Sequence, residues 1–283
     1  MNQRQTIRGG IYHAIRRTAG AKAAESIERF NRRRRQGYWL PKARYRQNRQ
    51  QLESYRDTHR GERCFILGNG PSLKDMDLTP LRHEITIGLN RIYLLFPSLG
   101  FTTTYLASIN PHVLRQWRDD FLALPIPKFL SWSMRSEFPV RGDIALVYSD
   151  NSRETFNADV ATGVWEGGTV TYVALQLAFF MGFDDVILIG VDHSFQTPGP
   201  AHQLVTSSGS DPDHFHPDYF GKGVQWQLPD LEMSERGYRL AERAYSAAGR
   251  RVRNATLGGR LKIFPLADYR AVLDEPRPAR GAI

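Results

Sequence analysis

Short apolar runs that alternate with helical segments constrain the fold of this chain more than any other feature of its sequence. The strongest run lies in DDVILIGVDHSF, residues 184–195, where Val186 to Ile189 are continuously apolar. RCFILG, EITIGLN and TTYLASIN are further buried runs, and weaker ones lie at 126–132 and 143–148. Uninterrupted apolar strands alternating with helices are typical of parallel sheets, because both faces of such a sheet are covered. The sequence therefore predicts an α/β domain with a Rossmann-like, mostly parallel sheet and helices on both faces.

Two helices, a last strand and a long loop complete the expected domain. The pattern predicts a buried helix over 167–183, a long helix over 229–252 and a short strand over 261–264. Residues 196–227 have no periodicity and are rich in Pro, Gly, Ser, Asp and His. A loop of this length in a compact domain is usually functional or disordered.

The excess positive charge of the chain belongs to its first sixty residues. Residues 1–60 contain 16 Lys and Arg against 4 Asp and Glu, whereas residues 61–283 contain 22 against 25. The net formal charge of +9 is therefore the sum of a strongly basic part and a nearly neutral part. We expect a basic helical N-terminal arm over 1–60, a nucleotide-binding α/β domain over 61–270 and a tail over 271–283.

The arm has the pattern of a basic amphipathic helix. Ile11, Ile15 and Ala19 recur at helical spacing, and an aromatic pair that includes Trp39 follows a run of arginines. Such a segment, residues 1–40, suits an anionic membrane surface. On charge alone it would suit nucleic acid equally well, but the domain contains no nucleic-acid-binding motif, and no nucleic acid partner is expected. Packing of the arm on its own domain or on a second subunit is the alternative.

Cysteine content and hydropathy indicate the compartment. Cys64 is the single cysteine, which excludes an internal disulfide and a thiolate zinc site. No apolar run approaches the ~20 residues of a spanning helix, and the N-terminus lacks the apolar region of a secretory signal. These features predict a cytoplasmic protein. It would be peripheral on the inner membrane if the arm binds lipid.

Polar residues follow three of the predicted strands that precede residue 111. The first strand ends in the turn Gly-Asn-Gly-Pro-Ser, residues 68–72, and the next two end at Asn90 and Asn110. Ligands of open parallel sheets bind at the carboxyl ends of strands, and glycines let backbone amides approach a phosphate. A tight strand-to-helix turn is the simpler reading of the glycines, and turn formation is the simpler reading of Asn110.

The strongest strand also ends in polar residues, and the long loop follows it. Asp192 and His193 come directly after the strand, and an Asp at this position commonly binds a ribose or a metal. The loop carries His202, Asp211, Asp213, His214, His216, Asp218 and Tyr219. A histidine beside a carboxylate can act as a general base near neutral pH, and the same cluster could bind a divalent cation.

The buried helix opens at Gly168 and Thr169 after a glycine pair. A helix N-terminus with a hydroxyl group attracts anions, so this end is a further candidate for binding phosphate. Helix capping and tight packing would explain the same residues without a ligand.

The motifs FILGNGPSLKDMD, GLNRIY, SINP, GGTVTYVALQLAFFMGFDDVILIGVDHSF and DYFGKG, in this order, resemble the 6-hydroxymethylpterin diphosphokinase-like superfamily. That superfamily includes a bacterial branch found among surface-polysaccharide genes and the catalytic domain of motility-associated flagellin glycosyltransferases. The motifs are also similar to the sialyltransferases of glycosyltransferase family 42, which use CMP-sialic acid. The resemblance covers about residues 62 to 270 and leaves out the basic arm.

The resemblance implies a nucleotide site. Its nucleotide-binding residues would be Gly68, Asn69, Gly70, Ser72, Asn90, Asn110, Gly168, Thr169 and Asp192. The sequence departs from the sialyltransferases at two places. His193 and Ser194 stand where those enzymes have Phe-Tyr, and Asp218 stands where they have their catalytic histidine. The base is therefore left open among His216, His214 and His193.

These features favour a glycosyltransferase-like enzyme. It would move a sugar, such as a nonulosonate, from a nucleotide donor to a surface-glycan or lipid-linked acceptor without a required cofactor. The first alternative is a pyrophosphokinase that uses ATP and Mg²⁺, with Asp192, Asp211 and Asp213 as metal ligands. The second is a non-catalytic scaffold that binds a nucleotide or a glycan.

Overall fold

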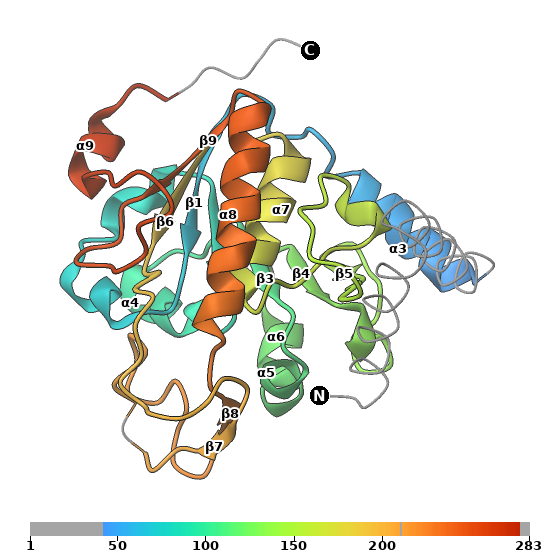
Figure 1. Ribbon diagram of the computed structural model, residues 1–283. Helices are drawn as coiled ribbons and strands as arrows, with labels where there is room; N and C mark the ends of the chain where they lie inside the picture. The colour runs from blue at the N-terminus through green and yellow to red at the C-terminus, as the bar shows by residue number, and fades with distance from the viewer. Residues whose placement is uncertain (1–41, 210, 278–283) are drawn as a thin grey trace, which may run out of the picture.

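Seven strands form the central sheet of the computed structural model, which describes residues 42–209 and 211–277 (Figure 1). All neighbouring strands pair in parallel, in the order β5-β4-β3-β2-β1-β6-β9. Their bounds are β1 Arg63–Leu67, β2 Thr86–Leu89, β3 Tyr105–Ser108, β4 Lys128–Ser131, β5 Ile144–Val147, β6 Asp185–Ile189 and β9 Arg251–Asn254. The predicted fold class, a Rossmann-like and mostly parallel α/β sheet, is confirmed.

The last strand of the sheet is not where the sequence predicted it. Residues 261–264 form no strand, although Leu261 and Phe264 are buried in the core. The strand is instead β9, where Val252 is buried between Arg251 and Arg253. This strand has no apolar run because an arginine stands on each side of Val252. Ion pairs neutralise the charges of the two arginines.

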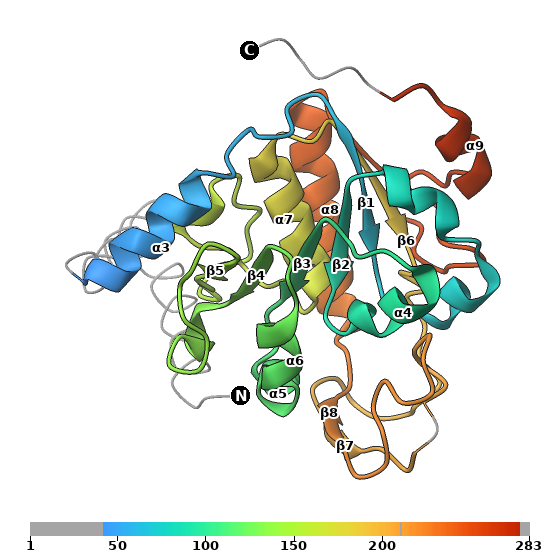
Figure 2. The same ribbon diagram turned by 180° about the vertical axis from the view of Figure 1, so that it is seen from behind.

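Helices cover both faces of the sheet (Figures 1 and 2). Their bounds are α3 Ala43–Glu53, α4 Phe96–Leu99, α5 Pro111–Gln116, α6 Arg118–Ala123, α7 Val170–Met181, α8 Leu231–Ala247 and α9 Tyr269–Asp274. Side chains alternate across each strand, so Ile66 packs in the core under α7 and α8, whereas Phe65 packs in the opposite core. In the described ranges, no helix has both the length and the apolar character needed to cross a membrane.

Helix α3 closes the β5 edge of the sheet. The buried side chain of Asn48 accepts a hydrogen bond from the Leu146 amide at 2.6 Å and donates one to the Leu146 carbonyl at 2.7 Å. The amide side chain thus takes the place of a neighbouring strand at an edge that would otherwise be unpaired. Residues 43–60 of the predicted arm therefore contribute to the packing of the domain. Residues 1–41, which include the whole predicted membrane-binding segment 1–40, lie outside the described residues.

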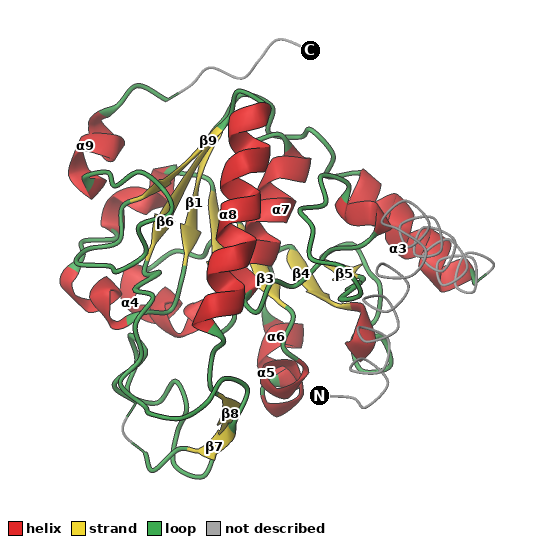
Figure 3. Cartoon of the chain, viewed as in Figure 1, coloured by secondary structure: helices red, strands yellow, loops and turns green. Residues whose placement is uncertain are grey.

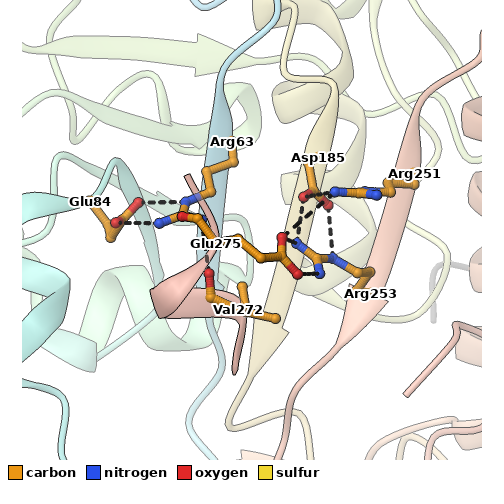
Figure 4. Close-up of polar contacts among 7 residues, drawn as sticks. All are labelled: Arg63, Glu84, Asp185, Arg251, Arg253, Val272 and Glu275. Atoms are coloured by element: carbon orange, nitrogen blue, oxygen red, sulfur yellow. Dashed lines mark hydrogen bonds and ion pairs between the residues drawn. The ribbon is translucent and has the colours of Figure 1, made fainter. Parts of the chain in front are cut away.

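Charged residues attach the C-terminal segment to the amino ends of the strands (Figure 4). The cluster comprises six charged residues and one apolar residue, Val272. The charged residues are Arg63, Glu84, Asp185, Arg251, Arg253 and Glu275. Arg63 binds Glu84 at 2.8 Å, and both side chains are almost fully buried. Arg253 binds Asp185 at 2.6 Å and Glu275 at 2.6 Å. Arg63 also donates to the Val272 carbonyl in α9 at 2.8 Å, so residues beyond the predicted boundary at 270 are held to the sheet.

The long loop projects from the carboxyl ends of the strands (Figure 3). It contains a two-stranded antiparallel hairpin, in which β7 (Leu204–Thr206) pairs with β8 (Gln225–Gln227). Sequence periodicity did not indicate these strands because each has three residues. The hairpin extends the wall of the crevice described next.

Candidate functional site

The chain changes direction in the sheet between β1 and β6. From β1 it builds β2 to β5 on one side, and it then returns to place β6 and β9 on the other. Such a switch point leaves a crevice at the carboxyl ends of the strands. A cavity of about 150 Å³ lies here, and its walls bring together many of the predicted site residues. They are Gly68, Asn69, Gly70, Asn90, Gly168, Thr169, Asp192, His193, Asp213 and His214.

The glycines of the β1 turn allow close contact with the β6 turn. A Cβ atom on Gly68 would lie 2.1 Å from the Gly190 carbonyl oxygen, and one on Gly70 would lie 1.7 Å from Asp192 Oδ2. The Gly68 amide donates to the Ile189 carbonyl at 2.8 Å, and the Gly70 amide donates to the Gly190 carbonyl at 2.9 Å. Packing of two turns is therefore sufficient to require both glycines.

Ser72 binds Asp192. Its amide donates to Asp192 Oδ1 at 3.1 Å and its hydroxyl to Oδ2 at 2.8 Å. The amides of Gly68, Gly70 and Ser72, which were expected to face a phosphate, all donate within the protein. The turn presents Asn69 to the cavity, and the buried Oδ1 atom of Asn69 accepts no hydrogen bond from the described residues.

Asp192 is a half-buried carboxyl group in the wall of the cavity. Burial raises the pKa of Asp192 above its usual range, and the two hydrogen bonds from Ser72 oppose that rise. Desolvation disfavours the charged form of the group. Asp192 thus lies in the cavity wall at the end of β6, where the sequence predicted it, and its ligand-binding role stays a prediction.

The N-terminus of α7 forms another wall. Thr169 caps the helix, because its hydroxyl accepts a hydrogen bond from the Thr171 amide at 3.2 Å. Gly168 through Thr171 line the cavity. The first amides of a helix have no acceptor within the helix and carry a partial positive charge. The helix end therefore supplies positive potential at this side of the cavity.

His214 and Asp211 form a hydrogen-bonded pair. His214 Nδ1 lies 2.9 Å from each carboxylate oxygen of Asp211, whose side chain is 4% exposed. The same carboxylate accepts from the amides of Asp213 and Phe220. An ionised carboxylate only accepts, so a neutral His214 paired in this way carries its hydrogen on Nδ1 and keeps the lone pair of Nε2. This is the arrangement that a general base requires.

Arg91 holds the segment that carries this histidine. Its guanidinium donates to the carbonyl of Asp218 at 3.0 Å and to the carbonyl of Tyr219, and it lies 3.9 Å from the centre of the Trp117 ring. Arg91 thus anchors the loop to the end of β2. This role depends on contacts between residues more than a hundred positions apart, which no local motif reveals.

Of the other candidate bases, only His193 lines the main cavity. His193 lines the cavity, and its Nε2 lies 3.3 Å from Glu235 Oε1. Its φ of +54° is in the left-handed region, which is uncommon outside glycine. His216 and Asp218 line neither this cavity nor its neighbour, and His216 Nδ1 accepts from the Asp218 amide. Both His193 and His214 thus line the cavity beside a carboxylate, but the partner of His214 is nearer, at 2.9 Å, and is 4% exposed, whereas Glu235 is 42% exposed.

A second cavity of about 130 Å³ adjoins the first beneath the hairpin. The two cavities share Asn90, Phe195, His214, Tyr219 and Pro229. Asn110 lines only the second cavity, where its Oδ1 caps α5 by accepting from the His112 amide at 2.8 Å. His214 therefore lies at the junction of the two adjoining cavities.

Of the metal ligands of the kinase alternative, Asp192 and Asp213 line the main cavity, whereas Asp211 does not. Asp213 accepts from the Gln196 amide and from the Thr197 amide and hydroxyl, and Asp211 holds His214. Within 42–209 and 211–277, no group of three or more His, Cys, Asp and Glu side chains is placed to hold a metal ion. The assignment of Asp192, Asp211 and Asp213 as Mg²⁺ ligands stays a prediction.

No protein-family model matches the chain, and no curated protein matches it. A solved structure that it resembles is that of the MAf glycosyltransferase from Magnetospirillum magneticum AMB-1, with 16% sequence identity and a TM-score of 0.48. The match covers 84% of this chain and 40% of that one, so this chain spans less than half the length of that protein. Similarity at this level does not identify the function of the chain.

Proposed function

We propose that this chain is a transferase that moves a sugar from a nucleotide-activated donor to a hydroxyl group of an acceptor glycan. The observation that supports the proposal is the Asp211–His214 pair, because His214 lines the crevice at the switch point of the sheet while its Nδ1 is paired with Asp211. A general base in a ligand crevice suits the activation of a hydroxyl nucleophile.

The donor would bind with its phosphate near the N-terminus of α7. Among the described residues, neither lysine nor arginine lines the main cavity. Its positive potential comes from the N-terminal end of α7. A phosphate at a helix N-terminus is stabilised by free amides and by the helix dipole. Asn69, Asn90 and Asp192 would bind the sugar and base of the nucleotide.

The transfer step would be a direct displacement at the anomeric carbon. The acceptor oxygen forms a bond to that carbon while the bond from the carbon to the phosphate oxygen breaks. His214 Nε2 takes the hydroxyl proton, and the electron pair of the broken bond leaves with the phosphate. The helix end and His193 would stabilise the charge that develops on the leaving group.

The resemblance of the sequence motifs supports a narrower version of the proposal. The donor would be a CMP-linked acidic sugar of the nonulosonate kind, and the acceptor would be a surface glycan or a lipid-linked glycan. The basic segment 1–40 would hold the enzyme at the anionic inner face of a membrane. Deletion of residues 1–40 should then abolish sedimentation with anionic liposomes. Unchanged sedimentation would contradict membrane binding by this segment.

Thermal-shift measurements with CMP, CDP, UDP and ATP, each with and without Mg²⁺, test the proposal. A ligand at 100 times its Kd stabilises a protein by about 2.7 kcal/mol, so we expect a rise in Tm of roughly 5 °C with one of the pyrimidine nucleotides. The shift should not need Mg²⁺. A shift with ATP that requires Mg²⁺ would favour the kinase instead.

Turnover distinguishes the transferase from a scaffold. Nucleotide release from a nucleotide-sugar should be lost in His214→Ala while the nucleotide shift remains. His216→Ala is the matched control, because His216 lines neither cavity. Equal rates in the wild type and both variants would contradict a role for His214 as base.

A further inference from the structure

The second cavity differs in chemistry from the main cavity. Of the described residues that line it, none is Asp, Glu, Lys or Arg, and His112 and His214 are the two that can become charged. The main cavity, in contrast, includes Asp192, Asp213 and the positive end of α7. A charged ligand group in the second cavity would lose water without gaining an ion-pair partner, which is unfavourable.

Side-chain amides and aromatic rings form most of the wall of the second cavity. Gln225 and Gln227 lie two positions apart on β8, so their side chains share one face of the strand. No hydrogen bond joins either of these amide groups to another described residue. Asn110 uses Oδ1 to cap α5, which leaves its amino group for a ligand. These groups both donate and accept hydrogen bonds, as hydroxyl groups do.

Phe195 adds an apolar surface at the junction of the two cavities. It is 37% exposed, which is unusual for a large apolar side chain, and it lines both spaces. Trp226 and Tyr219 contribute further aromatic atoms to the second cavity. Hydroxyl-binding amides next to exposed aromatic surface match a pyranose ring, which has polar edges and apolar faces.

We infer that the second cavity binds the acceptor as an uncharged pyranose residue, with one hydroxyl group facing His214 Nε2. The inference rests on the proposed function, because it assigns the acceptor side of the same reaction. It makes the β7–β8 hairpin the element that determines acceptor specificity. The hairpin is held in place by a hydrogen bond from Gln116 Nε2 to the Gln225 carbonyl at 3.0 Å.

The test measures saccharide binding directly. Saturation-transfer NMR with methyl β-lactoside and methyl β-maltoside would be compared with sialyl-lactose and with a serine-threonine peptide. The wild type should bind at least one of the neutral saccharides in preference to the sialylated sugar and the peptide. Gln225→Ala combined with Gln227→Ala should weaken that binding about tenfold, because two hydrogen bonds are lost.

Gln203→Ala is the matched control. Gln203 is an exposed amide before β7, and it lines neither cavity. Its removal should leave saccharide binding unchanged. The nucleotide-induced Tm shift of the double variant shows that the fold is retained, because β8 makes its strand contacts through the backbone.

The outcomes separate this inference from the proposed function. Absence of a nucleotide shift in the wild type overturns the transferase, whatever saccharide binds. A nucleotide shift together with saccharide binding that is equal in the double variant and the wild type overturns the acceptor assignment. Preference for sialyl-lactose or for the peptide overturns it as well. Neutral saccharide binding that is lost in the double variant and kept in Gln203→Ala supports it.

Discussion

The imidazole ring of His214 lies parallel to the phenol ring of Tyr219, with ring centroids 4.0 Å apart and planes 3° apart. Burial raises the pKa of Tyr219 well above its usual value, so the phenol stays neutral. One face of His214 is thus fixed by a neutral ring, and its Nδ1 edge is fixed by Asp211. Both contacts limit rotation of the imidazole, so the direction of Nε2 is set before a ligand binds.

Replacement of Asp211 by asparagine should disable the proposed base. The amide group can donate to Nδ1, which favours the tautomer with the hydrogen on Nε2 and removes the lone pair from the cavity. We expect transfer to fall by about 10²- to 10⁴-fold. Nitrogen chemical shifts of the His214 ring should show the change of tautomer near neutral pH.

The double variant Asp211→Asn with His214→Ala provides the internal check. If the two residues act as one unit, its activity should equal that of His214→Ala alone. Additive losses would contradict the assignment, because they would mean that Asp211 contributes by a route other than His214.

Arg91→Met should loosen the segment that carries the histidine. Methionine fills similar space but leaves the carbonyls of Asp218 and Tyr219 without the charged donor they have now. Hydrogen bonds to charged groups contribute about 1.5–3 kcal/mol, and we expect the free energy of unfolding to fall by about that amount. Amide hydrogen exchange should increase over residues 213–220.

Arg115→Met serves as the comparison for Arg91→Met. The Arg115 side chain is 60% exposed and pairs with Glu137 at 3.4 Å. Exposed ion pairs contribute about 0–1 kcal/mol, so this variant should unfold with nearly the same free energy as the wild type. Similar losses in both arginine variants would contradict an anchoring role specific to Arg91.

The sequence predicted the sheet well because most of its strands are buried on both faces. Cys64 to Leu67 and Val186 to Ile189 are almost free of solvent exposure, and the apolar runs record that burial directly. Strand β9 was missed because Arg251 and Arg253 interrupt its pattern. Their partner Asp185 is 66 and 68 positions away, so local sequence does not show that their charges are satisfied.

The site was predictable in location but less so in detail. Parallel strands end at one edge, and this geometry brings Asn69, Asn90 and Asp192 into one cavity as expected. Which amides remain free depends on contacts between turns that are distant in sequence. The Gly70 amide binds the Gly190 carbonyl, and a spacing of glycines cannot distinguish that bond from one to a phosphate.

Glu275→Gln should change the acid sensitivity of the fold. Hydrogen bonds from Arg253 lower the pKa of Glu275 below its ordinary 4.5, and nearby arginine charges add to the effect. A group with a lowered folded pKa stabilises the fold above its unfolded pKa, and this stability is lost as pH falls through the folded pKa. The wild type should therefore have a higher free energy of unfolding than Glu275→Gln near pH 7, and this difference should shrink below pH 4.5.

The effect of Glu275→Gln should be modest because the Glu275 side chain is 40% exposed. Solvent screening limits such a pair to under about 1 kcal/mol. Urea unfolding at several pH values measures it, with Glu232→Gln as the control, since the Glu232 side chain is 89% exposed on α8. A difference between wild type and Glu275→Gln that stays constant down to pH 3 would contradict the assignment.

Gly70→Ala tests whether packing of the two turns is what requires the glycine. The new Cβ would lie 1.7 Å from Asp192 Oδ2, a carboxylate that Ser72 holds in place. Overpacking of this kind costs about 1–3 kcal/mol. Gly142→Ala is the control, because nothing lies within 4 Å of its Cβ and its φ is not left-handed, so we expect no loss of stability.

The double variant Gly70→Ala with Asp192→Ala removes the clashing carboxylate. It should therefore lose less stability than the two single variants together. Strict additivity would mean that Asp192 is not what excludes a side chain at position 70, and the contact between the turns would then not explain the glycine.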